Sequence, residues 1–197
     1  MYQKLKKIIG PSSVIFSCLI STSVFAQGIG KMEETATVGE YVHGGYGAPI
    51  TKISRIDGTD GVLSGIKGAW IVNHQYALGM AAYTLVNNVP IVGYNAPLQY
   101  GVLGANFEYI YPLATDFSVA TSVLLGGAFV DFNDNPGNAD GLFVAEPEVN
   151  LLYAVTKNFK IGVNGSYRSV ADSDLAGLSN NKLSGFTYGL GLNFGAF

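Results

Sequence analysis

The last residues of the sequence read Phe186-Thr-Tyr-Gly-Leu-Gly-Leu-Asn-Phe-Gly-Ala-Phe197. Large apolar residues occupy every second position from Phe186 to Phe194, and small or polar residues fall between them. A period of two residues is typical of a β-strand with two unlike faces. An apolar face of this kind needs a cover, and we expect lipid to provide it.

The composition of the whole chain favours a membrane protein. Only 13% of the 197 residues are charged, against about 25% in an ordinary soluble domain, and the mean hydropathy is +0.28. No run of 18 apolar residues follows residue 26, so a transmembrane helix is not expected. Because every backbone polar group in lipid must be paired internally, the remaining spanning structure is a closed β-barrel.

The first 26 residues have the pattern of a cleaved secretory signal peptide. Lys4, Lys6 and Lys7 precede an apolar segment, and Ala26 supplies the small residue at the cleavage position. A lipoprotein signal with Cys18 as the acylated residue is the alternative. Cleavage after residue 26 would leave no cysteine for a disulfide or a metal site, and no basic patch for nucleic acid. We expect residues 27–39 to form a periplasmic tether.

The rest of the chain, 40–197, is expected to form the barrel domain. Its segments alternate apolar and polar residues and are separated by stretches rich in Gly, Pro, Asn and Asp, which are typical of turns. The sequence therefore predicts an all-β fold, an eight-stranded antiparallel up-and-down transmembrane β-barrel, with strands at 40–55, 62–72, 76–86, 99–111, 117–132, 142–155, 159–170 and 184–197.

The predicted connections alternate in length. Those at 73–75, 112–116 and 156–158 are short, and those at 89–98, 133–140 and 171–183 are long, with 56–61 a moderate connection in a long-loop position. Short turns on one side and long loops on the other are typical of transmembrane barrels, in which the short turns face the periplasm. An even number of strands then places both ends of the barrel domain on the periplasmic side.

Ionisable residues on the polar faces of the strands are the main candidates for chemistry. A turn at 156–158 would place Glu146 opposite Arg168, and we predict an ion pair between them inside the lumen, because an unpaired buried carboxylate costs several kcal/mol. A narrow barrel has room only for side chains, so structural salt bridges are favoured over a gate or a proton path. The predicted lumen charges are Lys67, Glu108, Glu146, Glu148, Lys160 and Arg168.

Aromatic residues gather near the short turns and the end of the last strand. Such clustering predicts a girdle at the periplasmic membrane interface. The girdle is predicted to contain Trp70, Tyr76, Tyr109, Tyr111, Phe117, Tyr153, Phe159, Phe194 and Phe197.

Pro49 and Pro147 fall inside predicted strands, where we expect bulges or rim positions because proline cannot donate a hydrogen bond to the ladder.

Taken together, the signal peptide, the eight amphipathic strands, the alternating turns and the terminal Phe197 resemble small eight-stranded outer-membrane barrels of the OmpA/OmpX class. The resemblance covers residues 40–197. It implies the outer membrane of a Gram-negative bacterium and insertion by the barrel-assembly machinery, which reads the terminal strand. Phe197 matches that signal, but Asn193 and Gly195 do not, since the apolar series is one residue out of phase with Phe197.

The sequence offers no catalytic, cofactor-binding or metal site. His43 and His74 are both predicted at the periplasmic end, whereas a hydrolase of outer-leaflet lipid would need its base near the outer rim. The acidic loops 131–140 and 172–174 have the composition that turns require, and weak binding of divalent cations by them stays open. We therefore do not expect an enzyme.

The predicted function is that of an integral outer-membrane barrel with a structural or surface-interaction role and no open pore. Its expected partners are outer-membrane lipid, the assembly machinery and an extracellular partner reached through the long loops, and a monomer is expected. Two alternatives stay open: a membrane-embedded lipid-modifying enzyme, and a soluble periplasmic barrel that binds an apolar ligand. Inward packing of Phe107, Tyr109, Leu151 and Val163 would favour the soluble barrel.

Overall fold

The computed structural model describes residues 37–38, 41–91, 96–132, 140–171 and 179–197. The predicted signal peptide with Cys18, most of the tether and most of the two acidic loops lie outside these residues. The chain divides into two units, and the unit of residues 35–197 contains every described element.

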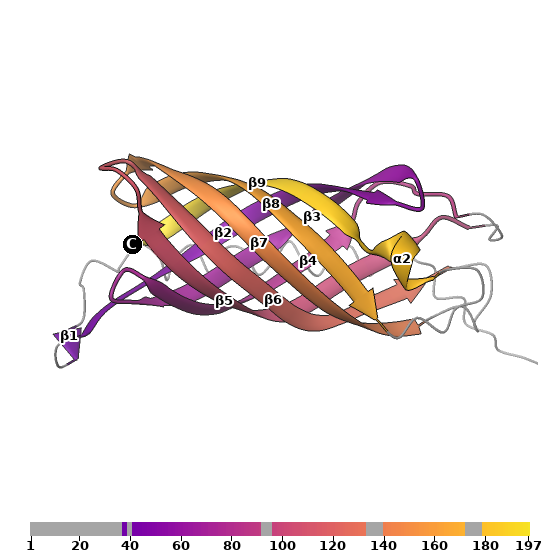
Figure 1. Cartoon of the computed structure of the whole chain (residues 1–197), viewed down its shortest axis with the longest axis horizontal. Helices are drawn as coiled ribbons and strands as arrows, with labels where there is room; N and C mark the ends of the chain where they lie inside the picture. Colours follow the sequence, from indigo (N-terminus) through magenta and orange to yellow (C-terminus); the bar gives the residue numbers. More distant parts are fainter. Residues whose placement is uncertain (1–36, 39–40, 92–95, 133–139, 172–178) are drawn as a thin grey trace, which may run out of the picture. The chain divides into compact units, whose positions relative to one another are not determined.

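Antiparallel strands account for almost all of this unit. Each strand pairs with its neighbour in the sequence, and β2 also pairs with β9, which closes the sheet into a barrel (Figure 1). This confirms the predicted all-β fold, an eight-stranded antiparallel up-and-down barrel. The strands are β1 (Thr37–Val38), β2 (Tyr41–Ile56), β3 (Thr59–Val72), β4 (Tyr76–Leu85), β5 (Gln99–Pro112), β6 (Phe117–Asp131), β7 (Asp140–Thr156), β8 (Phe159–Ala171) and β9 (Gly185–Ala196).

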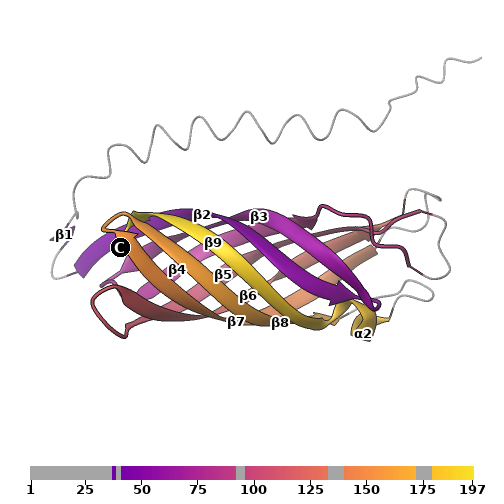
Figure 2. The ribbon, with the colours of Figure 1, turned by 90° about the horizontal axis from the view of Figure 1, so that it is seen from above.

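Strands β2 to β9 form the barrel wall, and they agree with the eight predicted segments to within about three residues at each end. The short strand β1 pairs only with the start of β2. The turns at 73–75 and 157–158 lie at the same end of the barrel as the end of β9 (Figure 2). A one-turn helix, α2 (Asn180–Leu183), precedes β9 at the opposite end. No helix in the described ranges has the length and apolar character needed to span a membrane.

The β2–β3 connection is a tight hairpin, so the prediction of a moderate loop at 56–61 was wrong. Only Asp57 and Gly58 separate the two strands, with φ of 46° and 80°. A type I′ hairpin turn requires positive φ at both central residues, and Asp-Gly is among the pairs that adopt it most readily. The dipeptide itself was therefore the signal for the turn.

The two strand prolines cause no bulge, and neither lies at a rim. Pro49 pairs with Ile66 of β3, and Pro147 pairs with Val123 of β6. On its other side, each proline falls in a two-residue gap of the ladder, after which pairing resumes in the same register. Proline removes one donor but leaves the extended backbone intact, so the strand continues unbroken.

The large apolar side chains of the wall point outward. Phe107, Tyr109, Leu151 and Val163 are between 40% and 59% exposed. In β9, Phe186, Tyr188, Leu190 and Phe194 are exposed, whereas Thr187 and Asn193 between them are buried. The inward packing that the soluble-barrel alternative requires is therefore absent from these residues.

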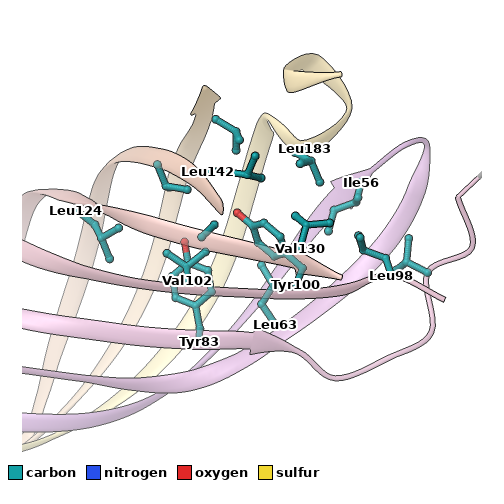
Figure 3. Packing of buried hydrophobic residues seen from close by; sticks show 14 of the residues in the cluster. Ile56, Leu63, Tyr83, Leu98, Tyr100, Val102, Leu124, Val130, Leu142 and Leu183 are labelled. Atoms are coloured by element: carbon teal, nitrogen blue, oxygen red, sulfur yellow. The ribbon is translucent and has the colours of Figure 1, made fainter. Parts of the chain in front are cut away.

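The interior consists of layers. A large apolar cluster fills the half toward the long loops, and Figure 3 shows Tyr100, Val130 and Leu142 of the wall meeting Leu183 of α2 there. A smaller cluster, defined by Ile71, Ala77, Ile110, Ala120 and Leu152, lies near the short turns. Buried charges lie where the two clusters approach one another: Lys67 pairs with Ala48 and Ala81 of the larger cluster, and Glu108 pairs with Ala77 of the smaller one.

Candidate functional site

Six side chains of Lys, Arg and Glu are buried in the described part of the barrel. Three carry positive charge and three carry negative charge, so the interior is neutral when all of them are ionised. Each has an exposed fraction of 8% or less. They are Lys52, Lys67, Glu108, Glu146, Glu148 and Arg168.

Five of these residues form a chain of alternating charge across the lumen, which we call the charge chain. Lys52 Nζ lies 2.6 Å from Glu146 Oε1 and 2.7 Å from Glu148 Oε2. Lys67 Nζ lies 3.1 Å from Glu148 Oε1 and 2.9 Å from Glu108 Oε1. Each lysine thus bridges two carboxylates, and Glu148 is shared by both lysines.

The barrel topology explains why these groups meet. Lys52 belongs to β2, whose ladder partners are β1, β3 and β9, while Glu146 and Glu148 belong to β7. Lys52 therefore reaches its partners across the lumen and not along a ladder. A lysine can do so because the interior of an eight-stranded barrel is only wide enough to be filled by side chains.

Neutral donors complete the two ends of the charge chain. Glu146 accepts hydrogen bonds from Tyr83 and from Ser166, the latter at 2.6 Å. Glu108 accepts hydrogen bonds from Tyr46 and Asn106. A buried charged group is tolerated when its remaining hydrogen-bonding capacity is satisfied, and these donors provide that for both terminal carboxylates.

The predicted ion pair between Glu146 and Arg168 does not form, although the two residues do lie opposite one another. The predicted turn at 156–158 was wrong: the turn is 157–158 and pairs Thr156 with Phe159, and a bulge between Ala154 and Thr156 restores the predicted register. Ala145 pairs with Ser169 and Glu148 with Ser166, which sets Glu146 opposite Arg168. Glu146 forms its salt bridge with Lys52 instead.

Arg168 is fully buried and is held at the long-loop end of the lumen. Its Nε donates to the carbonyl oxygen of Leu183 at 2.9 Å, and its Nη2 donates to Ser54 Oγ at 2.9 Å. The guanidinium lies 5.1 Å from the ring centre of Tyr100. These contacts attach the end of α2 to the barrel interior and explain why Arg168 turns away from Glu146.

Lys160 does not join the charge chain. It is part-buried, and its Nζ lies 4.1 Å from the ring centre of Phe197. Lys52, which was not among the predicted lumen charges, joins the charge chain instead. The blurred phase of the glycine-rich first strand concealed it. Charge balance gave no signal, because the predicted set of lumen charges was already balanced, with three positive and three negative residues.

The predicted girdle aromatics pair across neighbouring strands at the short-turn end. The ring centres of Tyr76 and Tyr109 are 5.3 Å apart, those of Phe117 and Tyr153 are 5.0 Å apart, and Phe159 stacks on Phe194 at 4.7 Å. Trp70 and Tyr111 are exposed on the same outer surface.

Phe197 departs from the girdle and turns inward. It stacks on Tyr46 with ring centres 5.9 Å apart and packs against the smaller apolar cluster. The outward positions of β9 have even numbers, from Phe186 to Phe194, so residue 197 has the parity of the lumen face. The phase mismatch seen in the sequence therefore reflects a side chain that covers the short-turn end of the lumen.

The two histidines lie near the short turns and form no catalytic arrangement with the described residues. His43 stacks on Trp70 with ring centres 5.2 Å apart, and His74 lies in the β3–β4 turn with a φ of 57°. The described part of the chain brings no three His, Cys, Asp or Glu side chains together in a way that could hold a metal ion.

Solved structures with the same architecture are similar to this chain at low sequence identity. The N-terminal β-barrel domain of Pseudomonas aeruginosa OprF matches with a TM-score of 0.58 and 13% identity, over 77% of this chain and 96% of that one. Neisserial surface protein A matches with a TM-score of 0.51 and 13% identity, over 78% of this chain and 96% of that one. The chain thus has the eight-stranded barrel fold of the OmpA/OmpX class.

No protein-family model matches the sequence. No curated protein matches it either.

Proposed function

We propose that this protein is an integral outer-membrane barrel with a structural or surface-interaction role and no open pore. The observation that carries the proposal is the combination of an apolar outer wall with a neutral, side-chain-filled interior. A closed antiparallel sheet leaves no unpaired edge, which is the condition for a sheet to span lipid. The short-turn end with its aromatic girdle would face the periplasm, and the long loops would face outward to meet partners.

The proposal includes cleavage of residues 1–26, insertion by the assembly machinery, a monomeric state and the absence of enzymatic activity. The positions of His43 and His74 support the last point, because both lie away from the long-loop rim where the acyl chains and headgroups of the outer leaflet would be reached.

Membrane localisation is tested by fractionation and electrophoresis. We expect the protein to remain in the outer-membrane pellet after washing with carbonate, and to migrate differently before and after boiling because a folded barrel resists detergent. Recovery in the soluble periplasmic fraction, with no change of mobility on boiling, would contradict the proposal.

Conductance measurements test the closed lumen. The charge chain joins β2, β3, β5 and β7 across the interior, and two clusters of buried apolar side chains add to the filling. We therefore expect no stable channels when the purified barrel is reconstituted in planar bilayers, under conditions in which a large porin conducts. Long-lived openings of uniform size would overturn the assignment of a plugged interior.

A further inference from the structure

The outer wall has a hollow near the long-loop rim, between β2, β9 and α2. Its volume is about 620 Å³, and its lining includes Ile53, Arg55, Asp57, Lys182, Phe186 and Tyr188. None of these residues belongs to the charge chain or to the girdle.

The lower wall of the hollow continues the apolar outer surface. Ile53 of β2 pairs with Tyr188 of β9, and their side chains are 53% and 66% exposed. Phe186, the next outward residue of β9, is 67% exposed and packs edge-on against Tyr167 at 5.2 Å. These three side chains offer an acyl chain a surface that continues the outward-facing belt.

Two basic residues stand where this apolar wall ends. Arg55 is the next outward residue of β2 after Ile53, and its Nε lies 3.8 Å from Asp60 Oδ1, with both side chains 74% exposed. An exposed pair of this kind contributes little, so the guanidinium is free to bind elsewhere. Lys182 Nζ lies 3.1 Å from Asp57 Oδ1.

The backbone holds Lys182 in place. The backbone N–H of Asp57 donates to the carbonyl oxygen of Lys182 at 3.0 Å, which joins the β2–β3 turn to α2. The hollow therefore combines an ammonium group that both carboxylate oxygens of Asp57 hold in place, an exposed guanidinium and an apolar wall.

We infer that this hollow binds a lipid with a phosphate monoester headgroup in the leaflet on the long-loop side. Arg55 would bind two phosphate oxygens in its planar fork, and Lys182 would donate to a third. Asp57 and Asp60 keep the hollow close to neutral, so free phosphate gains little there. The acyl chain must contribute through Ile53, Phe186 and Tyr188. The inference rests on the proposed membrane location.

Native mass spectrometry of the full chain in detergent micelles tests the inference. The probes are dioleoyl phosphatidic acid, dioleoyl phosphatidylcholine and inorganic phosphate. We expect the wild type to retain phosphatidic acid in preference to phosphatidylcholine, with no displacement by millimolar phosphate. The Arg55→Gln/Lys182→Gln variant should retain phosphatidic acid about tenfold less well, because it loses two charge-assisted contacts.

The matched control is Lys157→Gln, which removes one exposed positive charge at the opposite end of the barrel. It should leave retention unchanged. Equal retention of the two lipids, no loss in the double variant, an equal loss in the control, or full displacement by phosphate would each overturn the inference.

If the double variant does not fold, the single variant Arg55→Gln replaces it in the same measurement, because the side chain of Arg55 makes only an exposed contact and its loss should leave the fold intact. A wild type that remains membrane-bound and heat-modifiable but retains no lipid would refute this inference alone and leave the proposed function standing.

Discussion

Replacing Lys52 by methionine is expected to lower the free energy of unfolding by about 3–5 kcal/mol, the range found when one partner of a buried ion pair is removed. Lys52 is 5% exposed and is the only described residue that bridges Glu146 and Glu148. Methionine keeps the volume of the side chain but leaves the lumen with an excess of negative charge. Urea titrations in phospholipid vesicles, followed by the fluorescence of the single tryptophan, Trp70, would measure the change.

Two further variants separate this effect from the loss of any lysine. Lys157→Met removes an exposed lysine in the β7–β8 turn and should change stability by less than about 0.5 kcal/mol. Lys52→Met/Glu146→Gln restores charge balance, so its loss should be smaller than the sum of the two single losses. If Lys52→Met unfolded at the same urea concentration as the wild type, the charge chain would have no role in stability.

The wall of the barrel could be predicted from the sequence because its determinants are local. An alternating stretch such as 186–194 specifies a strand and its outward face whatever the rest of the chain does. The alternation of β7 and β8 also brought Glu146 opposite Arg168 as predicted, but the turn did not set that register: it pairs Thr156 with Phe159, and a bulge between Ala154 and Thr156 restores the predicted pairing.

The partners inside the lumen could not be predicted, because they depend on contacts across the barrel. Register places residues on neighbouring strands side by side, but Lys52 and Glu146 belong to strands that do not pair. Which long side chain reaches which carboxylate depends on barrel width and on the alternatives open to each group. Arg168 had such an alternative in the carbonyl oxygen of Leu183, which no alternation pattern reveals.

Phe197 shows how a local rule can be right while its consequence is missed. Phe197 is out of phase with residues 186–194, yet its position near the girdle aromatics in the sequence predicts that it faces outward with them. In the structure, phase decides the direction of the side chain, and Phe197 packs against Tyr46 in the lumen.

Replacing Val163 by arginine is the sharpest test of what surrounds the barrel. Val163 lies in β8 between Leu151 and Leu190, and its side chain is 59% exposed. It stands about 10 Å along the barrel axis from the aromatic ring of residue 159, well inside an apolar band about 25 Å tall. If lipid covers this surface, arginine there should cost about 2–4 kcal/mol, measured by urea unfolding in vesicles.

The depth dependence of that cost distinguishes lipid from every other cover. Leu113 lies in the β5–β6 turn and is 57% exposed, close to the value for Val163, so the two positions differ mainly in their distance from the barrel centre. Leu113→Arg should cost no more than about 1 kcal/mol, because arginine at the interface reaches headgroups and water. In a soluble barrel both positions would face water and both variants would stay within about 0.5 kcal/mol of the wild type. Equal small effects at the two sites would therefore contradict a membrane-spanning wall. A large cost at Val163 alone requires that an apolar medium surrounds the middle of the barrel and ends before the turn that contains Leu113.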